Sequence, residues 1–247
     1  MSDITIIWDE PHAYRVGNAR FALREGEAGY YVMKDRHLID YYLNLVPLKP
    51  RRILEIGTYT GGSSIFLYEL FGPEKLVCVD ARPDIPQAAA YLAERGLQEN
   101  IKLYPNIAQA DDQALTSLVT REIGNQLFDL IIDDASHLYE WSLRCFEILI
   151  PFLRSGGRYV LEDWGWAHWP GEYQKLGHQW SLQPALSNLV YDFTMLAASR
   201  PDIIDSIVIS TAPASTIAVL RKGEAILDKD FTIAKTVLTR GRQRHLL

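Results

Sequence analysis

RRILEIGTYTGGSS, residues 51–64, is the stretch that decides the fold of this chain. A short apolar run, residues 52–56, ends at a glycine-rich turn, and a helix-like stretch, residues 63–71, follows. This order is typical of a buried parallel strand, a tight loop and a helix N-terminus. Because glycine lets the backbone approach a ligand and a helix start presents unpaired N–H groups, the loop is predicted to bind a cofactor. The alternative is an ordinary strand-to-helix turn.

Strand-like and helix-like segments alternate after this loop, which predicts a parallel sheet. The predicted strands are residues 52–56, 76–79, 101–104, 128–133, 159–161, 203–210 and 216–221. The predicted helices are residues 63–71, 85–95, 111–123, 138–153 and 184–199. The last two strands lie close together in sequence, so we expect an antiparallel hairpin. The predicted class is α/β: a Rossmann-like, seven-stranded, mostly parallel sheet with a C-terminal antiparallel hairpin and helices on both faces.

Composition excludes several classes of protein. The 247 residues are 48% hydrophobic and 23% charged, as in an ordinary globular domain, and the net charge of −6 argues against a nucleic-acid partner. Cys78 and Cys145 lack metal or redox spacing, and no stretch is long and apolar enough for a membrane span or a signal peptide. We expect a cytoplasmic protein with no membrane partner. A basic cluster near the C-terminus is interpreted as a solvated chain end: Arg240, Arg242, Arg244 and His245.

The glycine spacing separates two kinds of cofactor loop. A dinucleotide fingerprint, Gly-x-Gly-x-x-Gly, would need glycine where Tyr59 stands. The pattern Glu-x-Gly-x-x-x-Gly, from Glu55 to Gly61, instead resembles motif I of class I S-adenosylmethionine-dependent methyltransferases. Asp80 ends the second predicted strand, where a carboxylate can accept hydrogen bonds from both ribose hydroxyls.

The resemblance implies further cofactor contacts and a fold. In that family the acidic residue before the turn, here Glu55, helps to fix the loop and the methionine end of the cofactor. Tyr59 and Ser63 match positions that touch the cofactor in catechol-type O-methyltransferases, and Gln109 falls where that group contacts adenine. The whole predicted cofactor set is Glu55, Gly57, Thr58, Tyr59, Gly61, Ser63, Asp80, Gln109 and Asp133. The seven-stranded methyltransferase sheet is the fold that this resemblance implies.

Acidic residues and a histidine gather at the ends of two predicted strands. Asp133, Asp134 and His137 follow the fourth strand, and Glu162-Asp163 follows the fifth. Adjacent parallel strands present their carboxyl ends at one edge, where ligands bind. Four carboxylates there would repel one another without a cation, so the sequence predicts a hard divalent ion such as Mg²⁺. The alternative is that some of these residues only cap helices.

The same segment resembles the metal-dependent O-methyltransferases. In the catechol and caffeoyl-coenzyme A group an Asp binds metal and a Lys acts as base; here Asp134 takes the metal position and His137 stands where Lys would be. The Asp-Asp-x-Ser-His form is closer to macrolide sugar O-methyltransferases of the macrocin and mycinamicin type. The Glu-Asp pair also resembles the cephalosporin-biosynthesis methyltransferase-like protein. Ser136 and Trp164 depart from the catechol pattern. The implied metal ligands are Asp134, Glu162 and Asp163.

His137 suits the role of general base. A cation makes a nearby hydroxyl more acidic, and an imidazole titrates near neutral pH, so it can take the proton before the oxygen attacks the methyl group. The alternative is a structural histidine at a helix start.

Domain organisation is predicted around this core. Residues 1–37 form an N-terminal extension or lid, residues 38–222 the methyltransferase domain, and residues 223–247 a C-terminal tail. Four of the six tryptophans lie in an insertion, residues 164–183, which suits an acceptor pocket or a subunit contact. The apolar stripe of residues 184–199 suits the core or a dimer face, and we expect a homo-oligomer.

Two functional hypotheses follow. The first is an enzyme, an S-adenosylmethionine- and Mg²⁺-dependent O-methyltransferase acting on a hydroxyl of a small natural product, such as a sugar or a glycosylated or polyketide metabolite. The second is a cofactor-binding partner subunit of a biosynthetic oxygenase or hydroxylase complex, with little transferase activity alone. A nicotinamide-dependent reductase is disfavoured by the glycine spacing.

Overall fold

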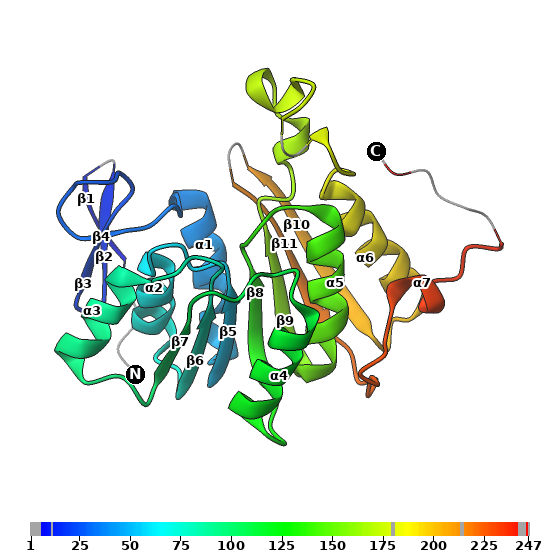
Figure 1. Cartoon of the computed structure of the whole chain (residues 1–247), viewed down its shortest axis with the longest axis horizontal. Coiled ribbons are helices and arrows are strands. Elements are labelled where there is room, and N and C mark those ends of the chain that lie inside the picture. Colours follow the sequence, from blue (N-terminus) through cyan, green and yellow to red (C-terminus); the bar gives the residue numbers. More distant parts are fainter. Residues whose placement is uncertain (1–5, 11, 179–180, 213–214, 242–245, 247) are drawn as a thin grey trace. The chain divides into compact units, whose positions relative to one another are not determined.

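The computed structural model describes residues 6–10, 12–178, 181–212, 215–241 and 246. Arg242, Arg244, His245 and Trp180, which belong to the predicted basic cluster and the aromatic insertion, lie outside the described residues. The chain divides into two compact units, Met1–Ala108 and Gln109–Leu247 (Figure 1).

The first unit begins with a small four-stranded sheet that the sequence did not predict. Strand β1 (Ile7–Glu10) pairs antiparallel with β2 (Ala13–Val16), β2 pairs antiparallel with β3 (Ala19–Ala22), and β3 pairs parallel with β4 (Tyr30–Tyr31).

Aromatic rings join this sheet to the rest of the unit. Phe66 meets the rings of Tyr14, Phe21 and Tyr42 edge-on, with centroids 6.1, 5.9 and 5.8 Å away. All four rings are buried, and edge-on contacts of this kind are favourable, so the N-terminal segment is docked onto helix α2 (Gly62–Phe71).

Three parallel strands form the centre of the first unit. Strand β5 (Arg52–Ile56) pairs with β6 (Lys75–Val79), which pairs with β7 (Ile101–Tyr104). Helix α1 (Arg36–Leu45) precedes β5, α2 follows β5, and α3 (Pro86–Arg95) follows β6. Residues 53–56 and 76–79 are all buried, as expected of parallel strands covered by helices.

The second unit carries the antiparallel end of the sheet. Helix α4 (Asp112–Ile123) leads into β8 (Phe128–Asp133), which pairs parallel with β9 (Leu153–Glu162). Strand β11 (Ser215–Lys222) pairs antiparallel with both β9 and β10 (Ile204–Ala212). Helices α5 (Tyr139–Leu149), α6 (Ser187–Ser199) and α7 (Ile233–Thr236) complete the unit (Figure 1).

The strand order β10-β11-β9-β8-β5-β6-β7 gives one seven-stranded, mostly parallel sheet. The predicted α/β class and the C-terminal antiparallel hairpin are therefore confirmed.

Two predicted helix boundaries are wrong. The helix expected to reach residue 153 ends at Leu149, because Pro151 follows and cannot donate an i→i−4 bond; a 3₁₀ turn, Ile150–Phe152, takes its place. The helix expected from residue 184 begins at Ser187. Strand β9 is longer than expected and includes Gly157, where an added Cβ would lie 3.0 Å from the Asp129 carbonyl oxygen of the neighbouring strand.

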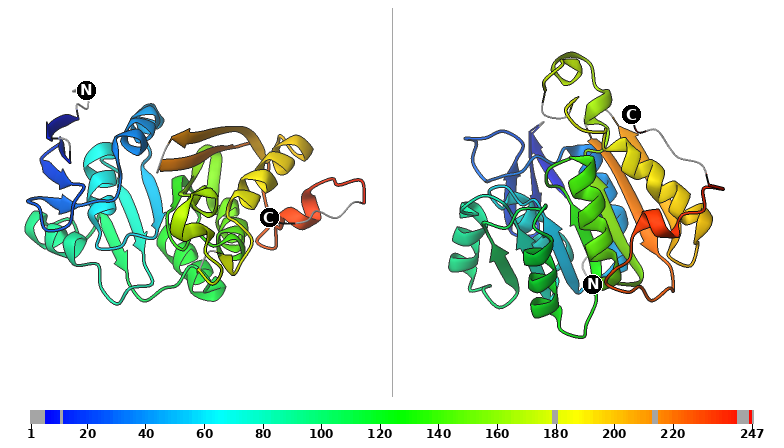
Figure 2. Two further views of the ribbon diagram at one scale, coloured as in Figure 1. Left: turned by 90° about the horizontal axis from the view of Figure 1, so that it is seen from above. Right: turned by 45° about the vertical axis from the view of Figure 1, so that its right-hand side comes forward.

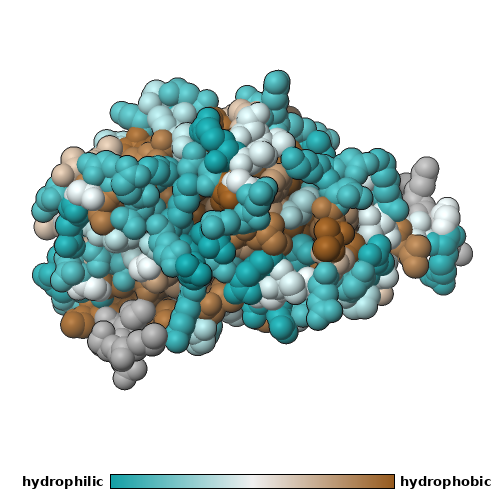
Figure 3. All heavy atoms as spheres, turned by 90° about the horizontal axis from the view of Figure 1, so that it is seen from below, coloured by the Kyte–Doolittle hydropathy of each residue, from teal (hydrophilic) through white to brown (hydrophobic). Residues whose placement is uncertain are grey.

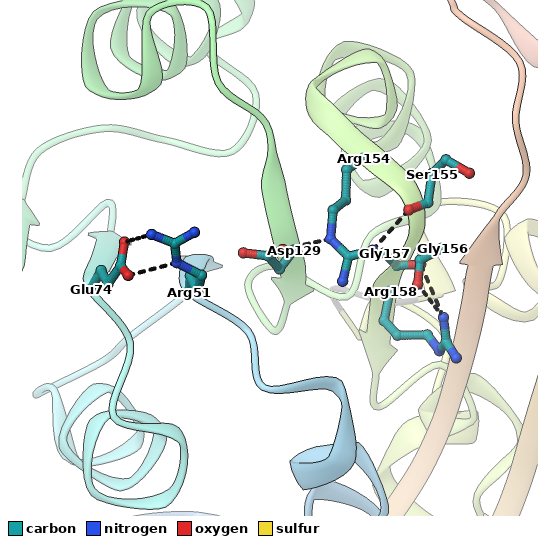
Figure 4. Close-up of polar contacts among 8 residues, drawn as sticks. All are labelled: Arg51, Glu74, Asp129, Arg154, Ser155, Gly156, Gly157 and Arg158. Atoms are coloured by element: carbon teal, nitrogen blue, oxygen red, sulfur yellow. Dashed lines mark hydrogen bonds and ion pairs between the residues drawn. The ribbon is translucent and has the colours of Figure 1, made fainter.

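Ion pairs are found near the amino-terminal ends of the parallel strands (Figure 4). In the first unit Arg51 bonds both carboxylate oxygens of Glu74, at 2.6 and 2.8 Å. In the second unit Arg154 pairs with the buried Asp129 at 2.5 Å. The first pair is largely exposed and adds little stability, whereas the second satisfies a buried charge.

The surface drawn in Figure 3 is mostly hydrophilic, with scattered hydrophobic patches. Among the described residues, no helix combines the length and hydropathy that a membrane crossing requires.

Phe66→Ala tests the docking of the N-terminal sheet. Removing a buried ring that touches three others should lower the free energy of unfolding by about 3–5 kcal/mol. Urea denaturation is the measurement. Leu176→Ala, at a fully exposed side chain, should change the same quantity by less than about 0.5 kcal/mol. Equal effects of the two substitutions would contradict the docking.

Candidate active site

The predicted cofactor loop has the backbone that its glycines suggest. Gly57 and Gly61 have φ of 87° and 97°, and Tyr59 between them has φ of 51°. A Cβ at Gly61 would lie 2.4 Å from the Ala88 Cβ, so α3 also requires glycine there. The loop therefore turns sharply from β5 into α2 with its backbone open to close approach.

Asp80 holds this loop from the end of β6. Its Oδ2 accepts hydrogen bonds from the backbone N–H groups of Thr58 and Tyr59, at 2.8 and 2.6 Å, and its Oδ1 accepts from Arg82 at 2.8 Å. A carboxylate has about four acceptor positions. One acceptor position of Asp80 therefore remains. Hydrogen bonds to both ribose hydroxyls would require one loop N–H to release the carboxylate.

The other predicted residues of the loop occupy distinct positions. Glu55 is buried and accepts a hydrogen bond from the Ser64 hydroxyl at 2.5 Å, which fixes the start of α2. Thr58 and Ser63 are also buried. Tyr59 is 37% exposed, and the Arg82 guanidinium lies 4.5 Å from its ring centroid. Tyr59 and Arg82 are thus the outward-facing pair of this loop, and the cofactor contacts of the set stay predictions.

Gln109 is the centre of a buried network in the second unit. Its side-chain N–H₂ donates to Asp133 at 2.6 Å and to the Ser142 hydroxyl at 3.2 Å. Its Oε1 accepts from the Ser136 backbone N–H at 3.3 Å and from the Ser136 hydroxyl. Both polar ends of one amide therefore tie the end of β8 to α5.

Asp133 is buried within the same network. Tyr159 donates its hydroxyl to Asp133 at 3.1 Å. Burial raises the pKa of Asp133 to about 7; the Tyr159 hydrogen bond opposes this rise and the Asp134 carboxylate adds to it. Gln109 and Asp133 bond one another in this structure, and their predicted contacts with the cofactor remain predictions.

The structure brings Asp134, His137 and Asp163 together. One ligand atom from each lies within 4.8 Å of the others, and the three side chains are partly exposed. In the part of the chain that the structure describes, these three residues form a group that could hold a metal ion. Glu162, predicted as a ligand, is not in the group; it is 1% exposed and pairs with Ile217 inside the sheet.

Two of these residues adopt unusual backbone conformations. His137 and Asp163 have φ of 56° and 54°, in the left-handed region that non-glycine residues rarely adopt. The Asp163 N–H donates to the Thr216 carbonyl at 2.7 Å, and the Gly165 N–H donates to the Thr216 hydroxyl at 2.8 Å. These hydrogen bonds therefore stabilise the strained backbone at Asp163.

The donor set fits a divalent cation. Around Mg²⁺, neighbouring ligand atoms are roughly 3.0 Å apart and opposite ones roughly 4.2 Å apart, because each bond is about 2.1 Å long and the geometry is octahedral. The three ligand atoms lie within 4.8 Å of one another, so they would have to move closer together to hold the ion. Two carboxylates suit Mg²⁺, and an imidazole would also suit Mn²⁺ or other transition metals.

Aromatic side chains border this cluster. His137 and Trp166 have ring centroids 4.5 Å apart, and Trp166 continues to Trp169 and Tyr173 at 5.8 and 6.2 Å. Figures 1 and 2 show this insertion projecting beyond the end of β9. A small pocket lies between the cluster and the insertion; its lining residues are His137, Leu138, Asp163, Trp164, Trp166, Ala167, Pro184, Ala185 and Leu186.

Sequence reasoning missed the residues that support the site. Tyr159 and Thr216 lie inside predicted strands, where alternation shows burial but not the partner. Gln87, whose side chain bonds the Tyr31 N–H and the Thr60 hydroxyl, looks like an ordinary helix residue in the sequence. No sequence signal identified these three.

The comparisons with known proteins agree with this geometry. Residues 54–164 match the family model of the methyltransferase domain. This match covers less than half of the chain, and the seven-stranded sheet with its C-terminal hairpin is the Rossmann-like fold that the resemblance to methyltransferases implies.

Curated O-methyltransferases are among the proteins that the chain is similar to. L-olivosyl-oleandolide 3-O-methyltransferase of Streptomyces antibioticus is 32% identical over 53% of this chain and 33% of its own length. Mycinamicin VI 2''-O-methyltransferase of Micromonospora griseorubida is 28% identical over 56% of this chain and 32% of its own length. The chain spans about a third of the length of these curated relatives.

A solved structure shares the fold. MycE methyltransferase from the mycinamycin biosynthetic pathway, in complex with Mg and SAH, aligns with a TM-score of 0.57 at 23% identity, over 78% of this chain and 51% of that one. This structure confirms the fold, and the sequence relatives confirm the resemblance to the mycinamicin type.

Asp163→Asn and Glu162→Gln distinguish the two possible ligand sets. Asp163→Asn removes a charge from the cluster and should weaken Mn²⁺ binding at least tenfold, whereas Glu162→Gln should leave it within about threefold of wild type. Isothermal titration with Mn²⁺ is the measurement. A larger loss in Glu162→Gln than in Asp163→Asn would restore Glu162 as a ligand.

Proposed function

We propose that this chain is an S-adenosylmethionine-dependent O-methyltransferase that acts on a sugar hydroxyl of a natural product and uses a divalent metal ion. The gathering of Asp134, His137 and Asp163 after β8 and β9 carries the proposal. The methyltransferase-domain match and the sugar O-methyltransferase relatives support it. MycE, solved with Mg and SAH, supports Mg²⁺ as the metal.

Each half of the chain has its own task in this proposal. The loop of residues 57–61, tied to Asp80, binds the methyl donor, and Glu55 keeps the loop fixed to α2. Asp134 and Asp163 would hold the cation, whose chemistry at such a site is to stabilise negative charge on the acceptor oxygen. His137 accepts the proton from the acceptor hydroxyl.

Orientation and exclusion of water complete the mechanism. His137 lies against Trp166, which limits the motion of the imidazole. The rings of Trp166, Trp169 and Tyr173 offer flat apolar faces against which a sugar or an aglycone can pack. Holding both reactants in line for attack supplies much of the expected rate acceleration.

The alternative of a partner subunit without activity of its own gains no support from the comparisons. Methyl transfer by the purified chain alone would close that alternative. The homo-oligomeric state and the cytoplasmic location remain predictions.

A thermal shift with S-adenosylhomocysteine tests the cofactor and the metal separately. A ligand at about 100 times its dissociation constant adds roughly 2.7 kcal/mol, which raises the unfolding midpoint by on the order of 5–10 °C for a domain of this size. We expect such a rise with the nucleoside and a further rise with Mg²⁺ that EDTA reverses. No rise with the nucleoside would contradict the proposed function.

His137→Ala tests the base. Turnover should fall by about 10²–10⁴, because a positioned proton acceptor is lost, while S-adenosylhomocysteine affinity stays within about twofold of wild type. Steady-state kinetics and titration of Mn²⁺ on the same variant are the measurements. Activity within about twofold of wild type would refute the base role. A tenfold loss of Mn²⁺ affinity would instead make His137 a metal ligand.

A further inference from the structure

Gln87 connects the N-terminal sheet to the cofactor loop. Its Oε1 accepts a hydrogen bond from the backbone N–H of Tyr31 at 2.7 Å, and its Nε2 donates to the Thr60 hydroxyl. Its own backbone N–H donates to the Thr60 carbonyl at 2.9 Å, which satisfies an otherwise unpaired group at the start of α3. One side chain thus links β4, the loop and α3.

A close backbone approach reinforces this link. A Cβ placed on Gly62 would lie 1.8 Å from the Tyr31 carbonyl oxygen, so the chain can pass there only because residue 62 is glycine. The rings of Tyr31 and Tyr59 meet edge-on with centroids 6.3 Å apart. Strand β4 is therefore joined to the loop region by a close backbone approach, by the amide of Gln87 and by a contact between two tyrosine rings.

A second anchor fixes the sheet farther along α2. The Asn18 backbone N–H donates to Glu69 at 3.0 Å, and Glu69 also accepts from the Tyr91 hydroxyl at 2.6 Å and from Arg95 at 3.0 Å. Two separate attachments, with the Phe66 ring cluster between α2 and the sheet, make the extension a docked part of this unit.

We propose that Gln87 is a positioning residue for cofactor binding: it couples the docked N-terminal sheet to the loop of residues 57–61, so that the extension sets the shape of the loop. The extension then works by bracing the loop. This inference rests on the proposed cofactor-binding function of the loop.

Gln87→Leu removes both side-chain hydrogen bonds while keeping the size of the side chain. Because two hydrogen bonds that hold the loop are lost, affinity for S-adenosylhomocysteine should fall about tenfold. The KM for S-adenosylmethionine should rise similarly while the KM for the acceptor stays unchanged. Gln87→Glu should rescue affinity to within about threefold, because a carboxylate can accept from both the Tyr31 N–H and the Thr60 hydroxyl. Gln98→Leu, at an exposed glutamine in the same unit, is the matched control.

Hydrogen exchange reads the coupling directly. In the wild type, S-adenosylhomocysteine should slow exchange in residues 30–32 as well as in residues 57–62, and Gln87→Leu should abolish the effect on residues 30–32. Unchanged exchange in residues 30–32 of the wild type, or affinity of Gln87→Leu within twofold of wild type, would overturn the proposal.

If the wild-type chain does not bind the nucleoside, the proposed function is refuted. The effect of Gln87 on the loop is then tested without ligand. Gln87→Leu must then speed exchange in residues 57–62; exchange equal to wild type would overturn the bracing as well.

Discussion

The loop after β5 depends on one carboxylate. Asp80 accepts three backbone N–H bonds, two of them from Thr58 and Tyr59 in the loop. Left-handed backbone at a residue such as Tyr59 costs on the order of 1–2 kcal/mol, and hydrogen bonds to a charged acceptor contribute about 1.5–3 kcal/mol each. The strand β6 thus stabilises, through its last side chain, a loop conformation that the loop sequence would not hold by itself.

In the second unit, an amide side chain holds the end of strand β8 in place. Asp133 and Asp134 are adjacent, so their side chains point to different sides of the strand end. Asp133 is 1% exposed and receives hydrogen bonds from Gln109 and Tyr159, whereas Asp134 joins the partly exposed cluster with His137 and Asp163. The buried and hydrogen-bonded Asp133 therefore fixes the backbone from which Asp134 enters the cluster.

The sequence predicted what depends on local pattern and missed what depends on strand register. The strands at residues 52–56 and 128–133 are observed with the predicted bounds, because continuous apolar runs end at glycine or aspartate. Asp134 and Asp163 come together because adjacent parallel strands share an edge. Glu162 lies inside β9 and outside the observed group, so its role as a ligand stays a prediction. The support from Thr216 depends on the pairing of β11, which periodicity cannot reveal.

The strained residues show where the geometry of the site comes from. Among the described residues with non-glycine side chains, six have positive φ, and three of them are Tyr59, His137 and Asp163. Strain of this kind costs on the order of 1–3 kcal/mol per residue and persists only where surrounding contacts enforce it. A hydrogen bond to Asp80 holds the backbone of Tyr59 in this conformation, and a hydrogen bond to Thr216 holds that of Asp163. The direction in which each side chain leaves the backbone is therefore set before any ligand binds. A ligand that binds at either residue would need to order only the side-chain torsions there, which lowers the entropic cost of binding.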